Sequence, residues 1–157
     1  MADWIRLTAP AAVVAALASP AHAVQYLSVA EAQKLAFPAA TRFVPAEGGR
    51  AFKAQAGDRV LGLFVLDHVI GKHLYIDYAV ALDASGRIHR VDILAYRESY
   101  GGEVRDASWL AQFVGKSSGS ALRVGQDIRN ISGATLSSHH VTEGVKRILA
   151  AYGSRAR

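Results

Sequence analysis

Three consecutive β-type segments joined by very short turns constrain the fold of this 157-residue chain more than any other feature. Residues 60–70 are apolar and rich in β-branched side chains, and a turn signal follows at 71–72. Residues 73–82 alternate between apolar and polar positions, which is the pattern of a half-buried strand. A hairpin turn at 83–86 leads into a third segment, 87–96. Because parallel pairing needs long crossovers, the sequence predicts an antiparallel meander.

Helical patterns flank this β region on both sides. Ser28 and Glu31 form a capping-box pattern at the start of a short helix, which Pro38 ends. We expect one more short strand over residues 50–55 and an extended segment over residues 123–131. Two further helices are expected over residues 106–115 and 139–152. The predicted fold class is therefore α+β, with an antiparallel sheet flanked by helices in a single domain.

Residues 1–23 have the composition of a secretory signal peptide. Arg6 supplies a positive charge, residues 7–18 form a short apolar run, and Ala21-His22-Ala23 is a small-x-small cleavage site. The alternative is a membrane anchor, but the apolar run is well short of the about 20 residues that span a bilayer. The sequence thus predicts an exported, periplasmic protein whose mature domain covers residues 24–157.

The charge and the cysteine content exclude several classes of function. The net formal charge is +5, yet no run of Lys or Arg is longer than two, and an exported protein rarely meets nucleic acid. We therefore expect no nucleic-acid partner. The chain has no cysteine, which excludes disulfides, Fe–S clusters, thiolate zinc sites and attachment of c-type haem. A role in electron transfer would need a carrier other than sulfur chemistry.

The stretch Ser132–Ser138, which reads Ser-Gly-Ala-Thr-Leu-Ser-Ser, has the clearest chemical potential. It stands just before the last predicted helix, where free backbone N–H groups and the positive end of the helix dipole favour phosphate. Gly133 permits a positive φ and a close backbone approach, and Ala134 adds little bulk. Thr135 would present its hydroxyl to the anion, and either final serine can cap the helix. From composition alone, an ordinary loop with a helix N-cap is the alternative.

The same stretch resembles the flavinylation motif Ser/Thr-Gly-Ala-Thr of the FMN-binding domain family. That family includes the covalent-flavin subunits of the sodium-pumping NADH:quinone oxidoreductase and of the Rnf electron-transport complex. Residues 97–103 resemble the segment that lines the flavin site in the family, and residues 109–116 resemble the helix that follows it. The resemblance is strongest over residues 60–152.

This resemblance implies an FMN-binding flavoprotein that acts as an electron-transfer module with a membrane-bound or periplasmic redox partner. A periplasmic flavin transferase would move FMN from FAD onto the hydroxyl of Thr135 and leave a phosphoester bond. Because the flavin supplies the redox chemistry, no catalytic residue of the protein is expected. The cofactor-binding residues implied are Thr135 (covalent FMN), Ser132, Gly133, Ala134, Leu136, Ser137, Ser138, Glu98, Tyr100, Gly101 and Gly102.

Two positions depart from the family pattern. Many members have Asp where this chain has Arg129, with Asp127 as the nearest carboxylate, and Tyr100 replaces the usual Pro. The residues themselves leave open a non-enzymatic periplasmic module that binds another phosphorylated or anionic ligand. The aromatic candidates for contact with a flavin ring are Tyr96, Tyr100 and Trp109.

The adjacent histidines His139 and His140 raise the question of a metal site. Neighbouring residues on a helix point about 100° apart, so the pair does not form one bidentate site. Ser, His and Asp side chains nearby also suggest hydrolysis, but the Gly-x-Ser-x-Gly motif is absent and a meander lacks the strand–elbow–helix setting. We therefore expect neither a metal nor a hydrolytic triad.

Overall fold

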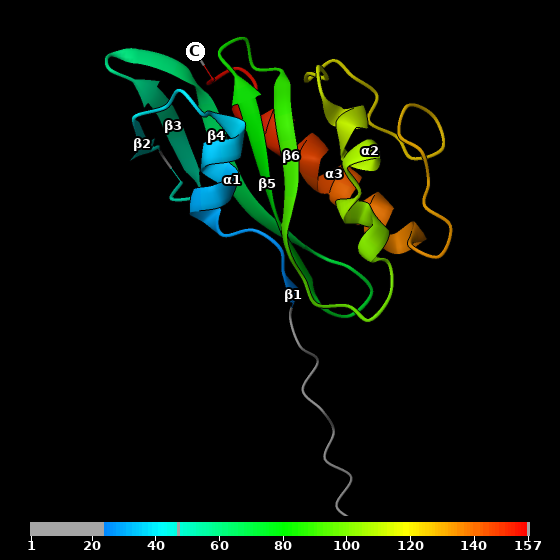
Figure 1. Ribbon diagram of the computed structural model, residues 1–157. Helices are drawn as coiled ribbons and strands as arrows, with labels where there is room; N and C mark the ends of the chain where they lie inside the picture. Colours follow the sequence, from blue (N-terminus) through cyan, green and yellow to red (C-terminus); the bar gives the residue numbers. More distant parts are fainter. Residues whose placement is uncertain (1–23, 47, 157) are drawn as a thin grey trace, which may run out of the picture.

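An antiparallel sheet of six strands, in the order β1-β6-β5-β4-β3-β2, organises the computed structural model (Figure 1). The structure describes residues 24–46 and 48–156, so the predicted signal peptide lies outside the described residues. The strands are β1 Val24–Gln25, β2 Arg42–Pro45, β3 Ala51–Ala56, β4 Arg59–Ile70, β5 Tyr75–Asp83 and β6 Ile88–Tyr96. The helices are α1 Val29–Ala36, α2 Ala107–Leu110 and α3 Thr135–Tyr152, with 3-10 turns η1 Gly102–Arg105 and η2 Ala111–Phe113. The predicted α+β class is confirmed.

The meander of β4, β5 and β6 forms the centre of the sheet, as the sequence predicts. Ile70 pairs with Tyr75 at one hairpin, and Leu82 pairs with Ile88 at the other. The carboxylate of Asp83 accepts hydrogen bonds from the backbone N–H groups of Ser85 (2.9 Å) and Arg87 (3.0 Å), which fixes the second turn. The short edge strands β1 and β2 were not predicted.

The sheet is buried on both faces, with α1 on one face and α2 and α3 on the other (Figure 1). The alternating side chains of β5 divide between the two faces. Ala79 and Ala81 pack on the face covered by α1, and the other face, covered by α3, buries Ile76, Tyr78, Val80 and Leu82. Helix α1 begins at the predicted capping box, in which the Ser28 hydroxyl accepts from the Glu31 backbone N–H and the Glu31 carboxylate accepts from that of Ser28.

Helix α3 packs closely against the sheet at Gly144. A Cβ on Gly144 would lie 2.2 Å from the hydroxyl oxygen of Tyr78, so the contact requires glycine. The Tyr78 hydroxyl donates to Asp67 (2.9 Å), and Arg147 of α3 donates to the same carboxylate (2.8 Å). Within the part of the chain that is described, no helix is long and apolar enough to cross a membrane.

The prediction of an extended segment over residues 123–131 is wrong. This segment forms a compact turn because the carboxylate of Asp127 accepts the backbone N–H groups of Arg123 (2.7 Å) and Leu122 (3.0 Å). The backbone hydrogen bonds, together with a hydrogen bond from Lys116 Nζ to the carboxylate at 3.1 Å, lower the pKa of Asp127 to about 2. They outweigh the effect of burial, which alone would raise this pKa. Asp127 therefore organises the loop that leads to Ser132–Ser138.

Candidate functional site

Two loops meet the N-terminus of α3 at one end of the sheet and enclose a cavity of about 520 Å³. We call it the helix-end cavity. It is lined by Lys72, His73, Glu98, Ser99, Tyr100, Gly133, Ala134, Thr135, Leu136 and Ser137. The fold thus brings together the two segments that the sequence analysis selected separately, after β6 and before α3. Lys72 and His73, from the connection between β4 and β5, were not predicted.

The backbone at the start of α3 explains why Thr135 is presented to this cavity. Gly133 has a φ of +83°, and Ala134 is the N-cap with a φ of −125° and no side-chain cap. Thr135 is therefore the first helical residue, and its side chain is exposed. The expectation that α3 begins at residue 139 with Ser137 or Ser138 as its cap is wrong. Both serines are buried within the first turn of the helix.

The hydroxyl groups of the stretch Ser132–Ser138 consequently have different roles. Ser138 donates to the carbonyl of Thr135 (2.9 Å) or to the Asn130 side chain (3.1 Å). The Asn130 amide also donates to the Thr135 hydroxyl at 3.4 Å. Ser132 is exposed beside the cavity without lining it. Thr135 is thus the hydroxyl of this stretch that combines exposure with a place in the cavity wall.

A hydrogen-bonded tyrosine joins the two motif segments behind the cavity. The Tyr96 hydroxyl donates to the carbonyl of Tyr100, so its oxygen is left to accept from Ser137 Oγ at 3.1 Å. Burial raises the pKa of Tyr96 despite the bond from Ser137. Gly101 has a φ of +90°, and a Cβ there would lie 2.6 Å from the Tyr96 hydroxyl and 3.2 Å from the Ala134 Cβ. Only glycine allows this approach, so Gly101 supports the cavity from behind.

Glu98 fixes the part of the cavity lining that comes from the connection between β4 and β5. Its carboxylate accepts the backbone N–H groups of His73 and of Leu74, the latter at 2.7 Å. Partial burial alone would raise the pKa of Glu98, but the backbone donors at residues 72–74 outweigh it and lower the pKa. A Cβ on Gly71 would lie 2.9 Å from the same carboxylate, so the connection between β4 and β5 packs tightly against it. Glu98 therefore shapes the wall through Lys72 and His73.

Other predicted positions lie outside the cavity. Gly102 begins η1 and does not line it. Of the aromatic candidates, Tyr96 and Trp109 are buried, whereas Tyr100 is 87% exposed and lines the cavity. Neither Asp127 nor Arg129 reaches the cavity wall; the Arg129 backbone bonds to Gln112 and Trp109.

The comparison with protein families agrees with this geometry. A model of the FMN-binding domain matches residues 71–150, a range that includes every residue that lines the helix-end cavity. The chain belongs to the FMN-binding domain family. It is an FMN-binding flavoprotein, as the resemblance of the two motifs implies. A search of curated proteins found no match to the chain.

The residues of the helix-end cavity fit the parts of FMN. The first-turn N–H groups of α3 have no acceptor within the helix, and Lys72 adds a positive charge, so a phosphate is accommodated at this end. Tyr100 and Leu136 expose 87% and 50% of their surface and offer apolar contact to a flavin ring. The volume falls within the range of about 300–1,000 Å³ of small-ligand sites.

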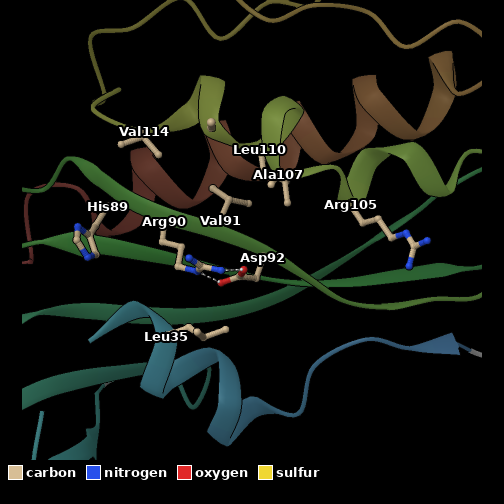
Figure 2. Close-up of a pocket in the computed structure, with 10 residues that line it drawn as sticks. Leu35, His89, Arg90, Val91, Asp92, Arg105, Ala107, Leu110 and Val114 are labelled. Atoms are coloured by element: carbon tan, nitrogen blue, oxygen red, sulfur yellow. Dashed lines mark hydrogen bonds and ion pairs between the residues drawn. The ribbon is translucent and has the colours of Figure 1, made fainter. Parts of the chain in front are cut away.

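A second concavity of the FMN-binding domain, the β6 groove, has a different character. Figure 2 shows it between α1 and α2, across β6. It measures about 370 Å³ and is lined by Leu35, His89, Arg90, Val91, Asp92, Arg105, Ala107, Leu110, Ala111 and Val114. Arg90 and Asp92 form a bidentate ion pair, with Nε 2.7 Å from Oδ2 and Nη2 2.8 Å from Oδ1. None of the predicted site residues lies here.

Proposed function

We propose that the FMN-binding domain carries its FMN covalently on Thr135 and serves as an exported electron-transfer module. One observation carries the attachment site: Thr135 is the first residue of α3, is exposed, and lines the helix-end cavity. Ser137 and Ser138 are buried and hydrogen-bonded, which disfavours them as acceptors. The sequence of this stretch, which resembles the flavinylation motif, supports the same atom.

The attachment step is a transfer of the FMN moiety from FAD. The Thr135 oxygen forms a bond to the phosphorus of the riboflavin phosphate, the pyrophosphate bond of FAD breaks, AMP leaves, and the threonine proton is released. The phosphodiester that results keeps one negative charge, which the N-terminus of α3 and Lys72 favour. When bound, the flavin supplies the electron transfer. Tyr100 and Leu136 would contact its ring, and Glu98 would hold the wall that contains Lys72.

The cellular setting belongs to the same proposal. Residues 1–23 would direct export and be removed, which places the domain in the periplasm together with a flavin transferase. A membrane-bound or periplasmic redox partner would then exchange electrons with the flavin. The scattered positive charge of the chain supports no nucleic-acid partner.

The test is to produce the full-length chain in two bacterial hosts that differ only in the flavin transferase. With the transferase, we expect yellow protein whose colour and added FMN mass persist after denaturation; without it, colour should be lost on denaturation. Colour that is lost on denaturation in both hosts would overturn covalent attachment. Protein that binds inorganic phosphate but no flavin would favour the module for another anionic ligand.

A further inference from the structure

The adjacent histidines of α3 have different surroundings, although both side chains are exposed. His140 Nδ1 lies 2.6 Å from the carbonyl oxygen of Ile70 and 2.9 Å from that of Gly71. Because carbonyl oxygens only accept, Nδ1 must carry the hydrogen and donate it. Among the residues described, His139 makes no side-chain hydrogen bond in the structure. One histidine of the pair therefore ties α3 to the end of β4.

The residues that His140 holds lead directly to the helix-end cavity. Gly71 packs against the Glu98 carboxylate, which accepts the backbone N–H groups of His73 and Leu74. Lys72 lies between these two attachments, and both Lys72 and His73 line the cavity. The short connection between β4 and β5 is thus fastened twice, by His140 on one side and by Glu98 on the other.

The same helix therefore contributes to the cavity in two ways. α3 begins at Thr135, and His140 follows five residues later, about 7–8 Å further along the helix axis. Thr135 lines the cavity, while His140 fixes the backbone that carries two other lining residues, Lys72 and His73. A shift of the connection would move Lys72 relative to the N-terminus of α3.

We infer that His140 is a positioning residue for the flavin site, which it serves by fastening the connection between β4 and β5. This inference rests on the proposed place of FMN in the helix-end cavity. His140 does not line the cavity, and it acts through Lys72 and His73. The pair of histidines that suggests a metal from sequence instead supplies one hydrogen-bond donor to two carbonyl groups.

Two substitutions separate the hydrogen bond from the bulk of the side chain. His140→Leu places a carbon near the position of Nδ1 and removes the donor, whereas His140→Asn restores an N–H donor at the same distance along the side chain. His139→Leu is the matched control on the adjacent position, which is also exposed. The proteins are made without the flavin transferase, and FMN binding is titrated by quenching of flavin fluorescence.

We expect His140→Leu to weaken FMN binding about two- to tenfold, the equivalent of one net hydrogen bond. His140→Asn should recover most of this loss, and His139→Leu should bind like the unmodified chain. Backbone hydrogen exchange at His73 and Leu74 should quicken in His140→Leu alone. These two results together support positioning, because a general loss of stability would quicken exchange throughout the core.

Unchanged FMN affinity in His140→Leu, or unchanged exchange at His73 and Leu74, would overturn the inference. An equal loss in His139→Leu would also overturn it. If His140→Leu fails to fold, His140→Asn provides the test. Clearly weaker FMN binding by this variant than by the unmodified chain would then overturn the inference. An unmodified chain that binds no FMN in the titration and gains no FMN mass when made with the transferase would instead refute the proposed function.

Discussion

The helix-end cavity and the β6 groove are of comparable size, about 520 and 370 Å³, but they are built from different chemistry. The cavity offers polar groups to a ligand: the first-turn N–H groups of α3, the positive charge of Lys72 and the exposed hydroxyl of Thr135. In the groove, Arg90 and Asp92 neutralise each other, and the third charged residue of its lining, Arg105, lies over the Tyr26 ring. A concavity therefore becomes a site for an anionic ligand when its polar groups are left free for that ligand.

The largest effect is expected at the attachment atom, which belongs to the helix-end cavity and has no counterpart proposed in the β6 groove. Thr135→Ala, made with the flavin transferase, should abolish covalent flavin because no exposed hydroxyl of the stretch Ser132–Ser138 would line the cavity. Ser137→Ala removes only the buried contact with Tyr96, so it should lower the yield of flavinylated protein without abolishing it. Mass spectrometry of the intact chains measures both. An FMN adduct on Thr135→Ala would assign the ester to another residue.

The backbone of the helix-end cavity is tested by two glycines with nearly equal φ. Gly101 (+90°) packs against Tyr96 and Ala134, whereas a Cβ added to Gly125 (+84°) would meet no atom within 4 Å. Alanine should strain both sites by about 1–2 kcal/mol, but Gly101→Ala should lose about 1–3 kcal/mol more because of the clash. It should also weaken FMN binding, unlike Gly125→Ala. Urea unfolding and FMN titration measure the difference, and equal losses would show that Gly101 is not a supporting contact.

Much of the cavity could be predicted because its chemistry is local in the sequence. Ser132–Ser138 and residues 97–103 carry the resemblance, and the meander between 60 and 96 follows from short turns and alternation. Lys72 and His73 escaped prediction because long-range contacts place them: Glu98 and His140 hold this connection from 25 or more residues away. No pattern near Lys72 contains that information.

The errors have equally specific causes. Polar residues just before an apolar periodic segment suggest a helix cap, but Ser137 and Ser138 find partners in Tyr96 and in the carbonyl of Thr135 and are buried. Residues 123–131 look extended until Asp127 folds them back with backbone bonds. The strand β1 has two residues and β2 has four, too few for a clear alternation.

A smaller effect is expected from the charge on Glu98, at the wall of the helix-end cavity. Because the folded-state pKa of Glu98 is lowered, its contribution to stability is present above its usual value of about 4.3 and is lost as the pH falls through the lowered value. Glu98→Gln should therefore cost about 1 kcal/mol at pH 7 and less in acid. Urea unfolding at several pH values checks this. A cost that is constant with pH would show that the charge is unimportant.

The smallest effect on flavin is expected from the β6 groove, although the same change affects folding. Asp92→Asn removes the buried charge that pairs with Arg90, whose side chain is 41% exposed, so the loss of stability should be about 1 kcal/mol. FMN affinity should stay within about a factor of two, since no residue lines both concavities and distant substitutions are nearly independent. FMN titration and urea unfolding on the same preparation measure both quantities. If Asp92→Asn weakened FMN binding as much as Gly101→Ala, FMN binding would depend on the β6 groove. Polar groups that are free in the cavity and paired in the groove would then not explain which concavity holds the ligand.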